Sequence, residues 1–145
     1  MYSYQYPRPA VTADIVVLHR SAEGVKILLI ERRNEPFAGC WALPGGFVDE
    51  NEDLADAAAR ELQEETSLVN LDLHQFQAFG APDRDPRGHT ITIAYWGVTD
   101  NPDSARADDD AKSLRWFPID QLPPLAFDHD KIIAMGLKVA GVKNL

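Results

Sequence analysis

The chain has 145 residues, a length typical of one compact domain, so we expect a single domain over 1–145. Hydrophobic residues make up 45% of it, which allows a buried core and argues against disorder as the dominant state. A net charge of −9 predicts a surface that repels nucleic-acid backbones and anionic membranes. We therefore expect neither as a partner, and an anionic substrate would need a local cation such as a bound metal.

The single cysteine, Cys40, excludes an internal disulfide, and we expect it to be a small buried or half-buried residue rather than a nucleophile. The first ten residues lack the pattern of a signal peptide, and no stretch reaches the length of a membrane span. These features predict a cytoplasmic protein. Tyr2, Tyr4 and Tyr6 alternate at strand spacing, which fits a swapped edge strand, a contact in a homodimer or a frayed end.

The first part of the chain predicts a hairpin. Residues 11–19 are β-branched and apolar, as in a buried strand, and 25–31 read as the partner strand after a turn at 21–24. Residues 32–44 are rich in proline and aromatic residues and predict a loop, which ends at two glycines.

The strongest helix signal in the sequence covers residues 53–66, and the polar cluster 49–51 before it is expected to cap the helix. Residues 71–79 and 89–98 predict two further strands. The loop between them, 80–88, carries arginine and aspartate side chains.

The last part of the chain predicts one more strand and a closing helix. Residues 101–112 are polar and acidic and predict an exposed loop, 113–119 a strand, and 128–142 a helix. Strands that surround one central helix, with a second helix at the end, indicate a mixed α/β domain whose sheet is covered on more than one side.

Three glutamates lie in an unusual place on the expected helix at 53–66. At 100° per residue, Glu61, Glu64 and Glu65 fall within about 100° of one another. They share this face with the apolar residues of the same segment, Leu54, Ala57 and Ala58. An ordinary acidic run is a solvated face and should lie opposite the apolar stripe.

Carboxylates that converge near a core raise one another's pKa and are costly to bury without a partner. A divalent cation would remove both problems, since Mg²⁺ and Mn²⁺ prefer hard oxygen ligands. Salt bridges from elsewhere in the chain could also satisfy this face. Geometry therefore favours a metal and leaves the salt-bridge alternative open.

The residues around this helix form a longer pattern. Gly46, five residues, Glu52, seven residues and then 60–68 (RELQEETSL) closely resemble the Nudix box, G-x5-E-x7-R-E-U-x-E-E-x-G-U with U aliphatic. Every fixed position matches except Ser67, where the family has glycine. A glycine just after a helix usually takes the left-handed conformation. A serine can adopt it at a cost of about 1 kcal/mol, or the helix can end differently.

The resemblance implies a Nudix-type α/β/α sandwich with a mixed sheet, in which the box forms a loop–helix–loop. It implies that Arg60 and Glu52 pair and brace the loop against the helix, within the catalytic machinery. It also implies a set of metal ligands, direct or through water: Glu61, Glu64, Glu65 and the backbone carbonyl of Gly45.

The chemistry of this set is hydrolysis of a phosphate anhydride. Mg²⁺, or Mn²⁺, would neutralise the diphosphate and lower the pKa of a bound water, and a carboxylate would take the proton. Glu64 is the first choice for this base. Asp108, Asp109 and Asp110 in the later acidic loop are alternatives, and a plain solvated loop is an equal interpretation of those three.

Three further stretches resemble the ADP-ribose pyrophosphatase branch of the family: 33–37 (RNEPF), 41–46 (WALPGG) and 83–89 (DRDPRGH), with Pro82 before the last. Arg33, Arg84 and Arg87 are therefore expected to contact substrate, the last two by bidentate bonds to phosphate or ribose. Phe37 or Trp41 could stack on adenine, or could simply pack in the core or loop.

The leading hypothesis is hydrolysis of ADP-ribose to AMP and ribose 5-phosphate. A second is hydrolysis of another nucleoside diphosphate derivative or of a damaged nucleoside triphosphate. A third, from another class of protein, is a non-catalytic domain that senses ADP-ribose. The acidic charge and intact glutamates argue against the third.

Overall fold

The computed structural model describes residues 2–107 and 113–142. Its described part contains one mixed sheet built around the long strand β1 (Ala10–Ser21), which pairs with β2 and β4 antiparallel and with β6 in parallel. The main strand order is β3-β2-β1-β6-β5, and β7 pairs with β2. The other strands are β2 (Gly24–Glu31), β3 (Trp41–Ala42), β4 (Gly45–Phe47), β5 (His74–Phe79), β6 (Thr90–Val98) and β7 (Leu114–Pro118).

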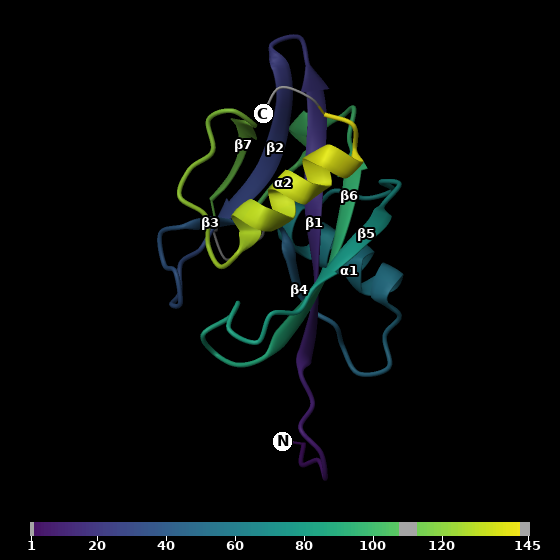
Figure 1. Ribbon diagram of the computed structural model, residues 1–145. Coiled ribbons are helices and arrows are strands. Elements are labelled where there is room, and N and C mark those ends of the chain that lie inside the picture. Colours follow the sequence, from purple (N-terminus) through teal and green to yellow (C-terminus); the bar gives the residue numbers. More distant parts are fainter. Residues whose placement is uncertain (1, 108–112, 143–145) are drawn as a thin grey trace.

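One helix covers each face of the sheet, α1 (Leu54–Thr66) behind it and α2 (His129–Val139) in front in Figure 1. Side chains alternate along β1 because successive residues of a strand point to opposite faces. Ala13, Ile15 and Val17 pack in the core under α1, whereas Val16 and Leu18 pack in the core under α2. The predicted α/β/α sandwich with a mixed sheet is confirmed.

The expected strands and helices all form, but several boundaries differ. The strand expected at 71–79 begins only at His74. The closing helix expected through residue 142 ends at Val139. Gly141 has a φ of +78°, and the Val142 N–H donates to the Leu137 carbonyl, which is the usual way a glycine terminates a helix.

Two local expectations are wrong. The expected loop at 32–44 contains β3, and β4 follows at once, because strands of two and three residues carry no periodic signal. The cluster 49–51 does not cap α1: Asp53 is the N-cap residue, and its side chain makes no capping bond. The backbone N–H of Asp49 donates instead to Glu52.

The segment before β1 is not a strand. Tyr2 and Tyr4 stack with ring centroids 6.2 Å apart, and the guanidinium of Arg8 lies 3.9 Å from the centroid of the Tyr4 ring. Tyr6 is exposed and Cys40 is half-buried. Within the described ranges, no helix has the length and apolar character needed to cross a bilayer.

Candidate active site

Helix α1 packs against the sheet with one apolar face. Its buried residues are Ala57, Ala58, Leu62 and Thr66, and the Thr66 hydroxyl donates to the Leu62 carbonyl. Ser67 ends the helix with φ 65° and ψ 2°, and its N–H donates to the Gln63 carbonyl. Of the two alternatives for Ser67, the left-handed conformation is the one observed, and the chain turns there as a glycine would.

Arg60 links the helix to the preceding loop. Its Nε and Nη2 donate to the two carboxylate oxygens of Glu52 at 2.8 and 2.9 Å, which confirms the predicted pair. Glu52 also accepts the Asp49 N–H at 3.0 Å. These bonds to the charged form, led by Arg60, lower the pKa of Glu52 to about 2.

Arg60 also contacts two of the three glutamates. Its Nη1 donates to Glu61 at 2.8 Å and to Glu64 at 3.2 Å, and its Nη2 donates to the Phe47 carbonyl. The Glu61 side chain is 13% exposed and that of Glu64 is 58% exposed. The expectation that all three glutamates lie toward the apolar side is thus wrong for Glu64, because the buried face is centred on Leu62 and leaves Glu64 at its outer margin.

Two glycines bring β4 against these glutamates. The Gly45 N–H donates to Glu65 at 2.7 Å. A Cβ at Gly46 would overlap the Glu61 carboxylate, and a Cβ at Gly45 would overlap the side chain of Asp14. Only a residue without a side chain permits such a close approach of backbone and carboxylate.

The donor set fits a hard divalent cation in its chemistry. Glu61 and Glu64 both accept a hydrogen bond from the same Arg60 nitrogen. The pKa of Glu61 is nevertheless raised, mainly by its burial and also by the nearby charge of Glu64. A cation beside these carboxylates would favour their charged forms. Arg60 and the Gly45 N–H already bind them, however, and over 2–107 and 113–142 no three acidic, histidine or cysteine side chains form a ready-made metal cluster.

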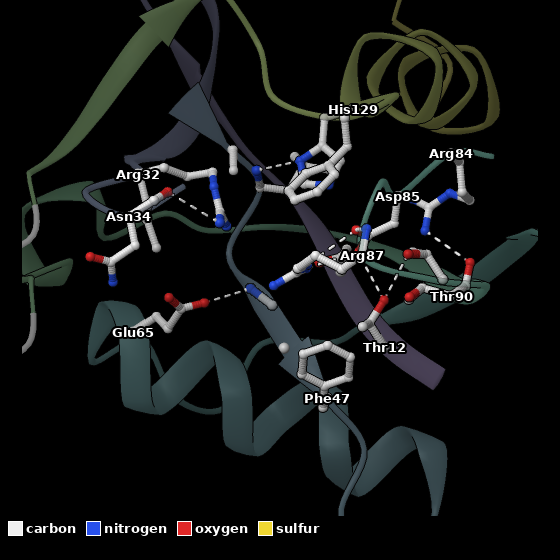
Figure 2. Close-up of a pocket in the computed structure, with 18 of the residues that line it drawn as sticks. Thr12, Arg32, Asn34, Phe47, Glu65, Arg84, Asp85, Arg87, Thr90 and His129 are labelled. Atoms are coloured by element: carbon white, nitrogen blue, oxygen red, sulfur yellow. Dashed lines mark hydrogen bonds and ion pairs between the residues drawn. The ribbon is translucent and has the colours of Figure 1, made fainter. Parts of the chain in front are cut away.

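An open pocket of about 500 Å³ adjoins the helix on the side where Glu65 meets β4. In Figure 2, Arg87 lies at the centre of the pocket, with Glu65 to one side and Thr90 to the other. The lining includes four arginines, Arg32, Arg33, Arg84 and Arg87. Three of them are the arginines that the sequence indicates as substrate contacts, and the structure brings them together from two distant loops.

The two arginines of the 80–88 loop already have carboxylate partners. Arg84 binds both oxygens of Asp128, at 2.9 and 2.7 Å, and donates to the Thr90 carbonyl; its side chain is 5% exposed. Arg87 binds Asp85 at 3.1 and 2.8 Å, and this pair lowers the pKa of Asp85. The bidentate bonds expected from Arg84 to substrate are made instead to Asp128, so Arg84 braces the pocket wall.

Two aromatic rings line the pocket next to the arginines, Phe47 and Phe127, and sequence reasoning missed both. The guanidinium carbons of Arg32 and Arg87 lie 4.9 and 5.4 Å from the Phe127 ring centroid. Phe37 packs edge-on against Phe127 outside the lining, and Trp41 packs against Phe117. Both side chains thus pack against other rings, and stacking on adenine stays a prediction.

Other lining residues missed from the sequence are Asp14, Arg32, Asp85 and His129. His129 is 5% exposed, and its Nδ1 accepts the Leu43 N–H at 3.0 Å. Burial lowers the pKa of His129, in keeping with a neutral ring. A lone aspartate inside an apolar strand, as at Asp14, is a sequence signal that could have been noticed. The proposed late bases Asp108, Asp109 and Asp110 lie outside the described residues.

The chain is similar to known proteins over nearly its whole length. The model of the NUDIX domain matches residues 8–135. The ADP-ribose pyrophosphatase of Methanocaldococcus jannaschii is 45% identical over 129 residues, which covers 88% of this chain and 73% of that protein. The ADPR-responsive transcriptional repressor NtrR of Acinetobacter baylyi is 33% identical over 132 residues, covering 88% of this chain and 53% of the repressor.

Solved structures agree with the fold. The NUDIX domain of Shewanella oneidensis NrtR, crystallised with ADP ribose, is 31% identical with a TM-score of 0.86, covering 93% of this chain and 90% of that one. A bifunctional NMN adenylyltransferase/ADP-ribose pyrophosphatase from Francisella tularensis, complexed with AMP and a manganese ion, is 31% identical with a TM-score of 0.78, covering 95% of this chain and 44% of that one. With the family model over most of its length and the glutamate helix in place, this chain belongs to the Nudix family and is a Nudix pyrophosphohydrolase.

Proposed function

We propose that this enzyme hydrolyses the diphosphate bond of ADP-ribose to give AMP and ribose 5-phosphate, with Mg²⁺ or Mn²⁺ as cofactor. The observation that carries this proposal is the position of Glu65, on the glutamate helix, in the wall of a pocket that also holds four arginines. Carboxylates able to hold a cation thus meet guanidinium groups able to hold phosphate. The similarity to the pyrophosphatase of M. jannaschii supports ADP-ribose as the substrate.

The electrostatics of the pocket suit a doubly charged diphosphate. Arg32 and Arg87 both lie over the Phe127 ring, and burial and the neighbouring Arg87 lower the pKa of Arg32. An anion held between these groups would relieve their repulsion and favour the charged form of both. The chain as a whole has a net charge of −9, so the arginines supply a local positive potential that the rest of the surface lacks.

Glu61, Glu64 and Glu65, with the Gly45 carbonyl, would hold the metal. When bound, it supplies charge neutralisation of the diphosphate and a water of lowered pKa. The Arg60–Glu52 pair would hold these carboxylates and the segment that follows β4 in position. Glu64 remains our first assignment for the base, because its exposed carboxylate can reach a water molecule from the solvent side.

Substrate identity can be tested with purified protein and a panel of compounds in Mg²⁺ or Mn²⁺. We expect ADP-ribose to be consumed with equimolar release of AMP and ribose 5-phosphate, and chelation with EDTA to stop turnover without unfolding the protein. Nucleoside triphosphates or other nucleoside diphosphate derivatives turned over far faster than ADP-ribose would overturn the substrate assignment.

The similarity to an ADPR-responsive repressor gives one observation in favour of a second candidate, binding of ADP-ribose without cleavage. The same panel separates the two. Tight binding of ADP-ribose by calorimetry, with no AMP formed in either metal, would identify a sensing domain, whereas AMP formation supports the enzyme.

A further inference from the structure

Asp14 is a buried carboxylate in the middle of the central strand and in the wall of the pocket. It is 7% exposed and pairs in register with Gly45 of β4. Thr12 and Asp14 lie on the face of β1 that carries Val16 and Leu18, because residues two apart share a face. Where the core under α2 stops, that face turns from apolar to polar and opens into the pocket.

The two oxygens of Asp14 have different environments. Oδ2 accepts a hydrogen bond from the Thr12 hydroxyl at 3.1 Å, and Thr12 in turn lies 2.7 Å from the Thr92 hydroxyl, which fixes the carboxylate on one side. Among the described residues, Oδ1 has no hydrogen-bond partner and no cation is paired with Asp14, yet no buried side-chain oxygen is left unsatisfied. Oδ1 therefore keeps accessible surface; it lies against the backbone of Gly45, where a Cβ would overlap it, and Asp14 is a residue of the pocket wall.

An ionised carboxylate can only accept hydrogen bonds, so its partner must bring a donor or be a cation. Phosphate oxygens would be repelled. The proposed function already assigns the metal to the glutamates of α1 and the Gly45 carbonyl, so the partner of Asp14 is sought among hydrogen-bond donors. The groups of a nucleoside diphosphate sugar that donate are the hydroxyls of its pentoses and the amino group of adenine. Asp14 borders Gly45, whose N–H binds Glu65. In the proposed function the diphosphate lies beside the glutamate helix, so Asp14 would lie close to the point where each pentose joins its phosphate.

We propose that Asp14 is a specificity-determining residue whose Oδ1 accepts hydrogen bonds from the adjacent hydroxyls of a pentose of the substrate. This inference rests on the proposed function, because it assumes that the pocket takes a nucleoside diphosphate pentose. It predicts selection for an intact ribose over analogues that lack its hydroxyls.

The test measures dissociation constants by calorimetry in EDTA, where no turnover interferes. The ligands are ADP-ribose, its 2′-deoxyadenosine analogue, and the ADP ester of tetrahydrofurfuryl alcohol, which lacks the hydroxyls of the terminal ribose. Inosine diphosphate ribose, without the adenine amino group, is the fourth. We expect wild-type protein to bind one of the two hydroxyl-deficient analogues about 10- to 100-fold more weakly than ADP-ribose, as for hydrogen bonds to a charged group. Which analogue loses affinity identifies the pentose.

The matched variant is Asp14→Asn, whose carbonyl can still accept from Thr12 while an amide group replaces the free oxygen. We expect it to bind ADP-ribose 10- to 100-fold more weakly than wild type and to lose most of its discrimination against the hydroxyl-deficient ligand. Asp72→Asn, at a side chain that is 91% exposed, is the charge control and should match wild type.

Several results would overturn the inference. Equal wild-type affinity for all hydroxyl-deficient analogues would do so without any variant, even if Asp14→Asn fails to fold. A loss of wild-type affinity confined to inosine diphosphate ribose would also overturn it. The same holds if Asp14→Asn bound all ligands equally more weakly and kept the preference for ADP-ribose over the hydroxyl-deficient analogues. Failure of the proposed function looks different: wild-type protein would not cleave ADP-ribose in metal. If it did not bind ADP-ribose at all, both proposals would fall.

Discussion

At the scale of single residues, the three glutamates of the box are not equivalent. Glu61 is largely buried against Gly46 and bound by Arg60, Glu65 is bound by the Gly45 N–H, and Glu64 is mostly exposed. An exposed side chain contributes little packing, so its removal tests chemistry more cleanly than removal of a buried neighbour does.

Glu64→Gln should leave the fold intact and reduce kcat for ADP-ribose by about 10²- to 10⁴-fold, the usual contribution of a general base. The measurements are AMP release at saturating substrate and a thermal melt. Near-normal activity with an unchanged melt would rule out Glu64 as base and shift attention to the acidic loop near residue 108.

Glu52→Gln should have a milder effect of about 10- to 100-fold in activity, because Glu52 acts through Arg60 rather than on the substrate. The amide keeps one acceptor for Arg60 but loses the charge that holds the bidentate pair. A readout specific to this positioning role is a raised metal concentration at half-maximal activity. An unchanged metal requirement would argue against it.

At the scale of elements, the β4 strand and α1 form one unit whose close contact depends on glycine. Gly46→Ala should therefore lose activity, because the new Cβ would displace the Glu61 carboxylate, whereas its free energy of unfolding should fall by only about 1 kcal/mol, because the displaced group is the end of a flexible side chain. Gly80→Ala is the matched control, since its Cβ would lie 3.7 Å from Ile91 in ordinary contact. Denaturant unfolding and AMP release measure both effects, and a Gly46→Ala protein that matched the control would contradict the argument.

At the end of α1, the opposite substitution, a residue with a Cβ replaced by glycine, should be stabilising. Ser67 adopts a left-handed conformation that is unfavourable for a residue with a Cβ, so Ser67→Gly should raise the free energy of unfolding by about 1 kcal/mol. Activity should stay the same, because Ser67 follows the carboxylates and lies outside the pocket lining. A destabilised or inactive variant would mean that the Ser67 side chain has a role that its backbone conformation does not reveal.

At the scale of the whole molecule, the sequence predicts what lies close along the chain and misses what the sheet brings together. The glutamate helix and the Arg60–Glu52 pair are eight residues or fewer apart, so spacing alone identifies them. The pocket instead joins Asp14 of β1, Arg32 after β2, Arg87 before β6 and Phe127 before α2. Their proximity follows from the parallel pairing of β1 with β6 and the return of α2 over the sheet, which no local pattern encodes.

His129 shows how this assembly should respond to pH. Its buried ring accepts the Leu43 N–H, and burial lowers its pKa below the ordinary value of 6.5. The unfolded chain therefore takes up a proton near pH 6.5 that the folded chain does not, so stability falls as pH drops below that value and is unaffected by His129 above it. We expect the melting temperature to decline between pH 7 and about pH 5.5. His129→Asn, whose side-chain oxygen can accept from Leu43 without titrating, should melt lower at neutral pH but with a flatter pH dependence. If the two proteins lost stability in parallel, the acid sensitivity would not originate at the contact between His129 of α2 and Leu43.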